Sequence, residues 1–346
     1  MKRFFEFVWP AIGLAAVVLS IFLLHRQFRG EAIGPQMWAQ LQAVPVHRYV
    51  LAVAATLVAY AALAWYDRIA LLHLGVKHIS LTFIALCSFT TYALAHNIGA
   101  SVFSGAMVRY RAYRTKGLTP GEITILVGLC SLTFGLGVLL LGGLLLVIDP
   151  TELRRLDGLL PPLLTNPATA RTLGITCLSL VAAYAAGSIF KLPPLRFGRF
   201  HLEYPRSGIA LRQFLAAPME LLGAAGIIYF ALPQAGNPGF FAVLAVFLAS
   251  FSAALASNAP GGLGVFELLF IKAMPAVAPL KVLTALLVFR LLYLIIPLAI
   301  AIVVVVRFER RQIAETLRQK TIAEGVLRER NPDQHKGKGR EPAGVA

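Results

Sequence analysis

The stretch 258–267 holds the residues best suited to chemistry and reads Asn-Ala-Pro-Gly-Gly-Leu-Gly-Val-Phe-Glu. Pro260 removes a backbone donor, and Gly261, Gly262 and Gly264 permit backbone angles that other residues avoid. A helix that follows this break would present free N–H groups at its start, which favour an anion such as a lipid phosphate. The alternative is a turn between two helices, with glycines for close packing.

Two charged residues near this stretch are expected to meet. Glu267 is the only acidic residue between Glu220 and Glu309, and Arg290 lies inside a long apolar run. A charged side chain within a membrane span normally faces a partner or a wet cavity, and we expect Glu267 or Glu220 to be that partner. Arginine also suits bidentate contacts with phosphate. A structural buried pair, or snorkelling to the interface, is the alternative.

A second break falls at 95–101, Ala-His-Asn-Ile-Gly-Ala-Ser, and is followed by basic and aromatic residues at 109–116. The basic cluster predicts a site that gathers anionic headgroups at a cavity mouth, or a cytoplasmic loop that sets topology. His96 is expected to bond a headgroup or to pack within the protein. Asp67 and Arg68 are expected to form a local interfacial pair.

Together these motifs predict one headgroup cavity and no catalytic residue. The sequence holds no P-loop, no metal-ligand cluster and no nucleophile elbow, so we expect no cofactor and no metal. The predicted cavity residues are Asn97, Gly99, Arg109, Tyr110, Arg111, Asn258, Pro260, Gly261, Gly262, Gly264, Glu267, Arg290 and Tyr293.

The elements that would hold these residues are membrane helices. The chain has 346 residues, 58% of them apolar and only 14% charged. Long runs without Asp, Glu, Lys or Arg cover 7–24, 49–66, 78–108, 123–148, 172–190 and 221–266. Runs of about 20 such residues can span a bilayer. We therefore predict an all-α, polytopic helical membrane protein with about 6–8 transmembrane helices.

The distribution of positive charge selects a topology. If all eight apolar segments cross, 17 Lys and Arg lie inside and 14 outside; if the segments around 79–101 and 239–275 re-enter, the counts become 23 and 8. The second arrangement obeys the positive-inside rule, with both termini cytoplasmic. One re-entrant segment from each face would make an inverted repeat. The segments 35–45 and 193–210 are expected at the interface.

The remaining features concern the two ends of the chain. We expect an uncleaved first span at 7–25, a membrane domain over 1–306, and a basic cytoplasmic tail at 307–346 that is partly helical and then disordered. The net charge of +16 lies in loops and in this tail, which indicates anionic lipid and excludes nucleic acid as the partner. Cys87, Cys130 and Cys177 are expected to be packing residues.

Three stretches resemble a known family. These are Pro260 to Glu267; Asn97-Ile98-Gly99 through Ser104-Gly105-Ala106 to Arg109-Tyr110-Arg111 and Tyr113; and Arg290 to Tyr293 followed by Pro297. Over roughly 5–306 the chain is similar to the transmembrane region of the lysylphosphatidylglycerol synthase (multiple peptide resistance factor) family. The resemblance implies translocation of aminoacylated or anionic phospholipids. Only 40 residues follow Val306, too few for the family's cytosolic synthase domain, so we expect a stand-alone membrane form.

These observations lead to one functional prediction and two alternatives. We predict an inner-membrane protein that flips anionic or aminoacylated phospholipids between leaflets. The protein could act as a monomer or as an oligomer. The first alternative is a lipid-modifying transferase of the phosphatidylglycerol lysyltransferase type, for which the sequence shows no catalytic group. The second is a membrane scaffold for a separate cytosolic lipid-synthesis enzyme, including a hopanoid-pathway protein.

Overall fold

A computed structural model describes residues 33–98, 101–193, 195–197, 200–202, 204–257 and 262–310. The expected first span, the tail after 310, and the site candidates Gly99, Asn258, Pro260 and Gly261 lie outside these residues. The chain divides into two compact units, Met1–Ala299 and Ile300–Ala346. The site lies within the first unit, and the described part of the second is helical.

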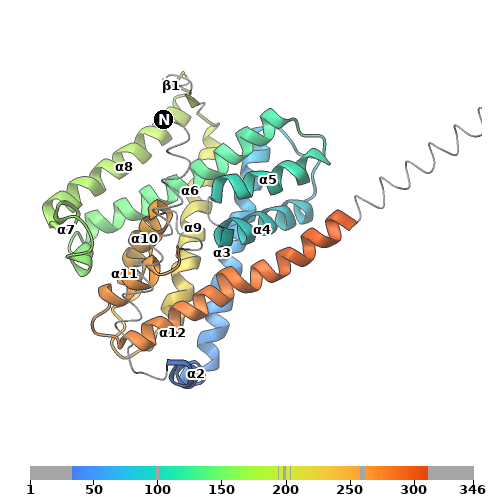
Figure 1. The fold of residues 1–346 in the computed structure, drawn as a ribbon. Helices are drawn as coiled ribbons and strands as arrows, with labels where there is room; N and C mark the ends of the chain where they lie inside the picture. The colour runs from blue at the N-terminus through green and yellow to red at the C-terminus, as the bar shows by residue number, and fades with distance from the viewer. Residues whose placement is uncertain are drawn as a thin grey trace, which may run out of the picture. The chain divides into compact units, whose positions relative to one another are not determined.

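The described chain is almost entirely helical, which confirms the predicted fold class (Figure 1). Its one small sheet is a hairpin of two three-residue strands, β1 and β2. The elements are α2 (Ile33–Ala43), α3 (Val46–His73), α4 (Leu81–Ile98), α5 (Ser101–Arg114), α6 (Pro120–Ile148), η1 (Glu152–Leu156), α7 (Pro162–Thr165), α8 (Pro167–Ile189), β1 (Leu195–Phe197), β2 (Phe200–Leu202), α9 (Ser207–Ala231), α10 (Phe240–Ser257), α11 (Val265–Ala273), α12 (Pro279–Phe289) and the π-helix η3 (Arg290–Ile295).

Six helices of the described chain are long and apolar enough to cross a membrane. They are α3, α6, α8, α9, α10 and the continuous helix Pro279–Arg310. Two of them begin at strong local signals. Thr119 and Glu122 cap α6 reciprocally, and the Asn166 side chain accepts from the Ala168 N–H at the start of α8.

Helices α3 and α9 pack along each other at the centre of the unit. At one end Arg48 of α3 bonds the carbonyl of Leu232, and at the other the Tyr66 hydroxyl donates to the carbonyl of Ala217 at 3.4 Å. The numbering rises along one helix as it falls along the other, so the two helices are antiparallel. Small residues allow the close approach: a Cβ added to Gly223 would lie 2.8 Å from the Ala55 carbonyl oxygen.

Helices α3 and α9 are each followed by a pair of shorter helices that folds back. Helix α4 packs on α5, and α10 packs on α11. The ends of the first pair meet where His78 Nε2 lies 3.2 Å from the Lys116 carbonyl oxygen. The ends of the second meet where a Cβ on Gly236 would lie 2.6 Å from the Ala276 carbonyl oxygen. Both pairs therefore return to the side from which they start.

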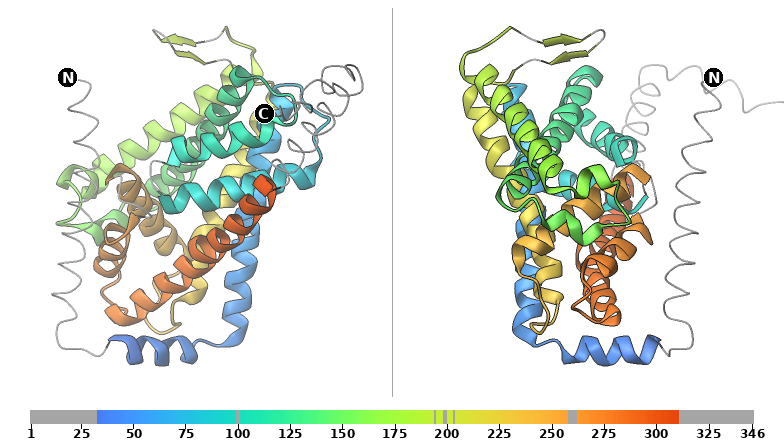
Figure 2. Two further views of the ribbon diagram at one scale, coloured as in Figure 1. Left: turned by 45° about the vertical axis from the view of Figure 1, so that its right-hand side comes forward. Right: turned by 90° about the vertical axis from the view of Figure 1, so that its left-hand side faces the viewer.

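The two hairpins approach from opposite ends of the bundle. The first follows the C-terminal end of α3, and the second follows the C-terminal end of α9, which lies beside the N-terminal end of α3. The sequence α3, α4–α5, α6 is thus repeated upside down as α9, α10–α11, α12, as an inverted repeat requires. We call the end that carries α2 the α2 face and the end that carries the β1–β2 hairpin the β1 face (Figure 2).

Candidate functional site

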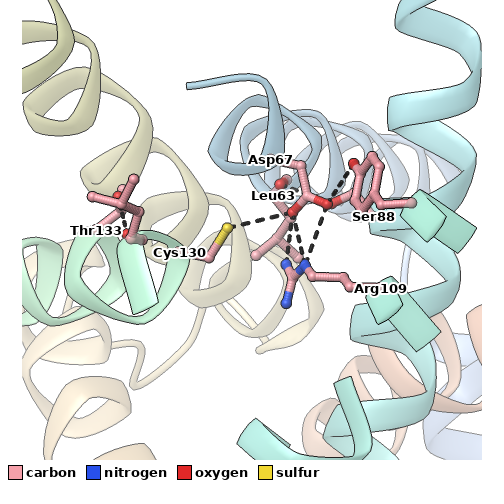
Figure 3. A network of polar contacts seen from close by, with 8 residues as sticks. Leu63, Asp67, Ser88, Arg109, Cys130 and Thr133 are labelled. Atoms are coloured by element: carbon pink, nitrogen blue, oxygen red, sulfur yellow. Dashed lines mark hydrogen bonds and ion pairs between the residues drawn. The ribbon is translucent and has the colours of Figure 1, made fainter. Parts of the chain in front are cut away.

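Asp67 and Arg109 form a fully buried ion pair near the β1 face. Arg109 Nη2 lies 2.6 Å from Asp67 Oδ1, and the two side chains are 5% and 0% exposed. The carboxylate also accepts from the Tyr113 hydroxyl at 2.9 Å and lies 3.5 Å from the Cys130 sulfur (Figure 3). Such additional bonds are what allows a charge pair to persist in a low-dielectric interior.

This pair corrects two sequence interpretations. Asp67 does not pair with Arg68 at an interface; it is 0% exposed and bonds Arg109 of α5. Successive helical side chains diverge by about 100°, whereas Arg109 comes from the facing hairpin. Arg109 is itself 4% exposed, so it does not stand at an open cavity mouth.

A second pair joins Glu267 of α11 to Arg290 at the start of η3. Glu267 is one of the two partners expected for Arg290. The other carboxylate oxygen of Glu267 accepts a hydrogen bond from the N–H of Gly264 at 2.7 Å. The N-terminal end of α11 is therefore already occupied by the carboxylate of its own Glu267. Gly262 and Gly264 adopt φ of +65° and +80°, the left-handed region that favours glycine.

The π-helix η3 supplies main-chain acceptors to neighbouring helices. Its wide turn disturbs the regular helical bonding, and inserted polar groups are a recognised cause of such bulges. The Tyr60 hydroxyl of α3 donates to the Tyr293 carbonyl at 2.9 Å, and Asn97 Nδ2 of α4 donates to the Leu294 carbonyl at 3.1 Å. The first broken segment therefore contacts η3 through Asn97, and the second contacts η3 through Glu267, which pairs with Arg290.

Aromatic rings connect the first ion pair to a third carboxylate. The guanidinium of Arg109 lies 4.9 Å above the Tyr92 ring, and Tyr92 lies 5.6 Å from His96. His96 stacks on Tyr293 at 5.3 Å, and the Tyr293 hydroxyl donates to Glu220 Oε1 at 2.7 Å. We call this series, from Asp67 through Arg109, Tyr92, His96 and Tyr293 to Glu220, the buried polar chain.

Within the buried polar chain, two side-chain atoms have no hydrogen-bond partner in the described structure. They are Glu220 Oε2 and His96 Nδ1. Glu220 is 2% exposed and, among the described residues, forms no ion pair within 4.0 Å. A buried polar atom without a partner is costly in a membrane interior. Glu220 Oε2 and His96 Nδ1 are therefore candidate contacts for a polar ligand.

The structure groups the predicted residues unevenly. It brings Asn97, Glu267, Arg290 and Tyr293 together around η3 and places Arg109 at the far end of the buried polar chain. Tyr110 is 42% exposed, and Arg111 is also exposed on the surface of α5. Gly262 and Gly264 form the turn before α11.

Sequence reasoning missed the partner of Asp67 and the contacts of Tyr92, and it considered Glu220 only as a partner for Arg290. The sequence did contain a signal for the two carboxylates. A lone acidic residue within or beside a long apolar run is energetically unfavourable in a membrane unless it has a partner or a function. Tyr92 offered no such signal, since an aromatic residue in a membrane helix is ordinary. Cys87 and Cys130 are buried free thiols, as expected of packing residues.

The arrangement offers paired charges that could exchange partners with a charged ligand. Within the described residues no cluster of His, Cys, Asp or Glu could hold a metal ion. A guanidinium paired with a carboxylate can transfer its bidentate bonds to a phosphate, and a freed carboxylate can accept an amine. A headgroup with a phosphate and an amine would therefore satisfy both halves of each pair.

The comparisons with known proteins agree with a membrane protein of this size. No family profile matches the chain. The chain is 30% identical over 321 residues to the uncharacterized protein slr0712 of Synechocystis, covering 91% of this chain and 95% of that protein. It is 31% identical over 309 residues to the inner membrane protein YbhN of Escherichia coli, covering 88% and 93%. The chain is therefore a helical membrane protein that belongs to the family of slr0712 and YbhN.

Proposed function

We propose that this protein carries the headgroups of anionic or aminoacylated phospholipids between the leaflets of the inner membrane. The observation that supports the proposal most directly is the buried polar chain, together with the Glu267–Arg290 pair, between two opposed hairpins. Charged groups at membrane depth mark the path of a polar substrate. The resemblance to the lysylphosphatidylglycerol synthase membrane region and the membrane location in the name of YbhN support the same proposal.

In the proposed mechanism the headgroup replaces internal ion pairs step by step. The phosphate takes the place of a carboxylate on Arg290 or Arg109, while the amine of an aminoacylated headgroup bonds Glu267, Glu220 or Asp67. The acyl chains stay in the bilayer. No covalent bond changes, and we place both termini in the cytoplasm, as the positive-inside distribution favours.

The test is a leaflet-exchange assay in protein-containing vesicles with acyl-labelled phosphatidylglycerol. A membrane-impermeant reductant bleaches label in the outer leaflet, and the rate at which inner label becomes accessible reports translocation. We expect exchange faster than in protein-free vesicles and a loss of at least tenfold in the Arg290→Ala variant. Arg155→Ala is the matched control, because Arg155 pairs with Glu152 within the short helix η1, outside the two hairpins.

Exchange at the rate of protein-free vesicles, or wild-type exchange by Arg290→Ala, would overturn the proposal. The same vesicles distinguish the alternatives. A transferase would leave a covalently altered lipid, which mass spectrometry of the extracted lipids would show. A scaffold would lose its cellular phenotype on deletion of 307–346 but not on substitution of Arg290.

A further inference from the structure

A cavity of about 360 Å³ opens at the α2 face, away from the buried polar chain. Four parts of the fold surround it: the end of α2, the start of α3, the loop after α9 and the start of α12. Its polar lining consists of Gln40, His47, Arg48, Gln234, Lys281 and Thr284. Cavities of roughly 300–1,000 Å³ are the usual size for small-molecule ligands.

The cavity is lined by basic residues, and no acidic residue lines it in the described part of the chain. Arg48 and Lys281 line it, and none of the residues that line it is Asp or Glu. The nearby segments 33–66, 221–266 and 268–308 hold no acidic residue at all. Arg48 is only 8% exposed, and its hydrogen bond goes to the neutral carbonyl of Leu232. A buried guanidinium normally has an anionic partner.

Two helix starts add to this positive charge. Helices α3 and α12 both begin at the cavity, and neither has a side-chain cap. The first turn of a helix favours acids and disfavours cations, because the free N–H groups there carry partial positive charge. Arg48 and Lys281 nevertheless occupy these first turns. Basic residues at a helix start are unfavourable by themselves, and they are expected where a bound anion compensates the positive charge.

The position of the cavity indicates what kind of anion it meets. Residues of α2 and early α3 present apolar groups outward, with Trp38 63% and Val50 61% exposed, as suits the membrane interface. Arg48 precedes Asp67 by 19 residues on α3, a rise of about 28 Å at 1.5 Å per residue. The cavity and the Asp67–Arg109 pair thus lie about one hydrocarbon thickness apart.

We propose that this cavity binds the phosphate of an anionic phospholipid headgroup in the leaflet at the α2 face. The inference rests on the proposed function and deepens it. It gives the translocation path a docking site at the end opposite the Asp67–Arg109 pair. Under the predicted orientation this is the outer face, where Lys and Arg are few. Arg48 provides the fixed guanidinium, and Lys281 the second cation.

The test is native mass spectrometry of the purified full chain with dioleoyl phosphatidylglycerol and, separately, dioleoyl phosphatidylcholine. We expect the phosphatidylglycerol adduct to weaken at least tenfold in Arg48→Gln and in Lys281→Gln, with the phosphatidylcholine adduct unchanged. Lys281 makes no hydrogen bond to another helix in the described structure, so its variant keeps the test valid if loss of the Arg48–Leu232 bond impairs folding. Lys77→Gln is the control, an exposed lysine at the β1 face.

Inorganic phosphate distinguishes the source of the ligand. If millimolar phosphate displaces phosphatidylglycerol from the wild type but not from Lys281→Gln, the site recognises the phosphate group by itself. If phosphate displaces no phosphatidylglycerol, the site requires the whole lipid. Equal phosphatidylglycerol binding by wild type, Arg48→Gln and Lys281→Gln would overturn the inference. Translocation by the same variants is measured separately, so a failed binding test leaves the proposed function to be judged by its own assay.

Discussion

The His78 ring nitrogen and the Lys116 carbonyl oxygen lie 3.2 Å apart, although 38 residues separate them. This contact joins the chain before α4 to the chain after α5. Lys116 also places its ammonium 4.7 Å from the centre of the Phe83 ring at the start of α4. The segment 79–101 therefore belongs to a hairpin whose two ends share one face, and α6 starts from that face.

The first prediction concerns membrane sidedness. Cysteines introduced at Lys77 and Lys116 should react with a membrane-impermeant maleimide from the same side of the membrane. The side is found by comparing the extent of labelling in right-side-out vesicles with that in inside-out vesicles. A cysteine at Thr151, beyond α6, should react from the opposite side. The background replaces Cys87, Cys130 and Cys177, of which the first two are buried. Reaction of positions 77 and 116 from opposite sides would show that this segment crosses instead.

The second prediction concerns the buried ion pair at Asp67. Asp67→Asn leaves the Arg109 guanidinium buried without its countercharge, and breaking a buried pair costs about 3–5 kcal/mol. We expect a large fall in the midpoint of thermal unfolding in detergent. Replacing both partners, as in Asp67→Leu with Arg109→Met, should recover much of that fall because no uncompensated charge remains.

The partly exposed pair Glu152–Arg155 provides the control for this experiment. Its side chains are 18% and 33% exposed, so Glu152→Gln should change stability by about 0–1 kcal/mol. If Asp67→Asn and Glu152→Gln lowered the midpoint equally, the Asp67–Arg109 pair would not hold α3 to α5 as described.

The third prediction separates stability from transport at Glu220. This carboxylate accepts one bond from the Tyr293 hydroxyl, which the amide oxygen of Glu220→Gln can also accept. We expect a change in unfolding free energy of about 1 kcal/mol or less. Translocation of aminoacylated lipid should nevertheless fall at least tenfold, because a neutral amide cannot form an ion pair with a cationic amine.

Tyr49→Phe is a suitable comparison for Glu220→Gln. It removes a hydroxyl bond to the Leu41 carbonyl, away from the buried polar chain, and should leave translocation unchanged. Wild-type translocation by Glu220→Gln would exclude Glu220 from the path and confine the proposed headgroup contacts to the two ion pairs.

The fourth prediction concerns the contact between α3 and α9. A Cβ at Gly223 would lie 2.8 Å from the Ala55 carbonyl oxygen and 2.9 Å from the Ala59 nitrogen, both main-chain atoms. Gly223→Ala should force the helices apart and cost about 1–3 kcal/mol, as overpacking does. Gly128→Ala in α6 meets no atom within 4 Å and should be neutral or slightly stabilising. Equal midpoints for the two variants would contradict this close approach.

Much of the fold follows from the sequence alone. The uncharged runs set the positions of the spans, because a helix must reach about 20 apolar residues to cross a bilayer. The break at 95–101, around Gly99, and the glycine-rich break at 258–264 set where two segments are interrupted, and the positive charges favour re-entry of both. The structure folds each broken segment into a hairpin at the corresponding place.

The pairing of the buried charges required the tertiary structure. The sequence places Asp67 next to Arg68, yet adjacent helical side chains diverge and Asp67 meets Arg109 from another helix. Glu267 and Glu220 were equal candidates for Arg290 until the second hairpin brought Glu267 to η3. Local sequence therefore determined which segments are helical and where they break. Which charge meets which was decided by the packing of opposed hairpins, because it depends on distances between helices that no local pattern encodes.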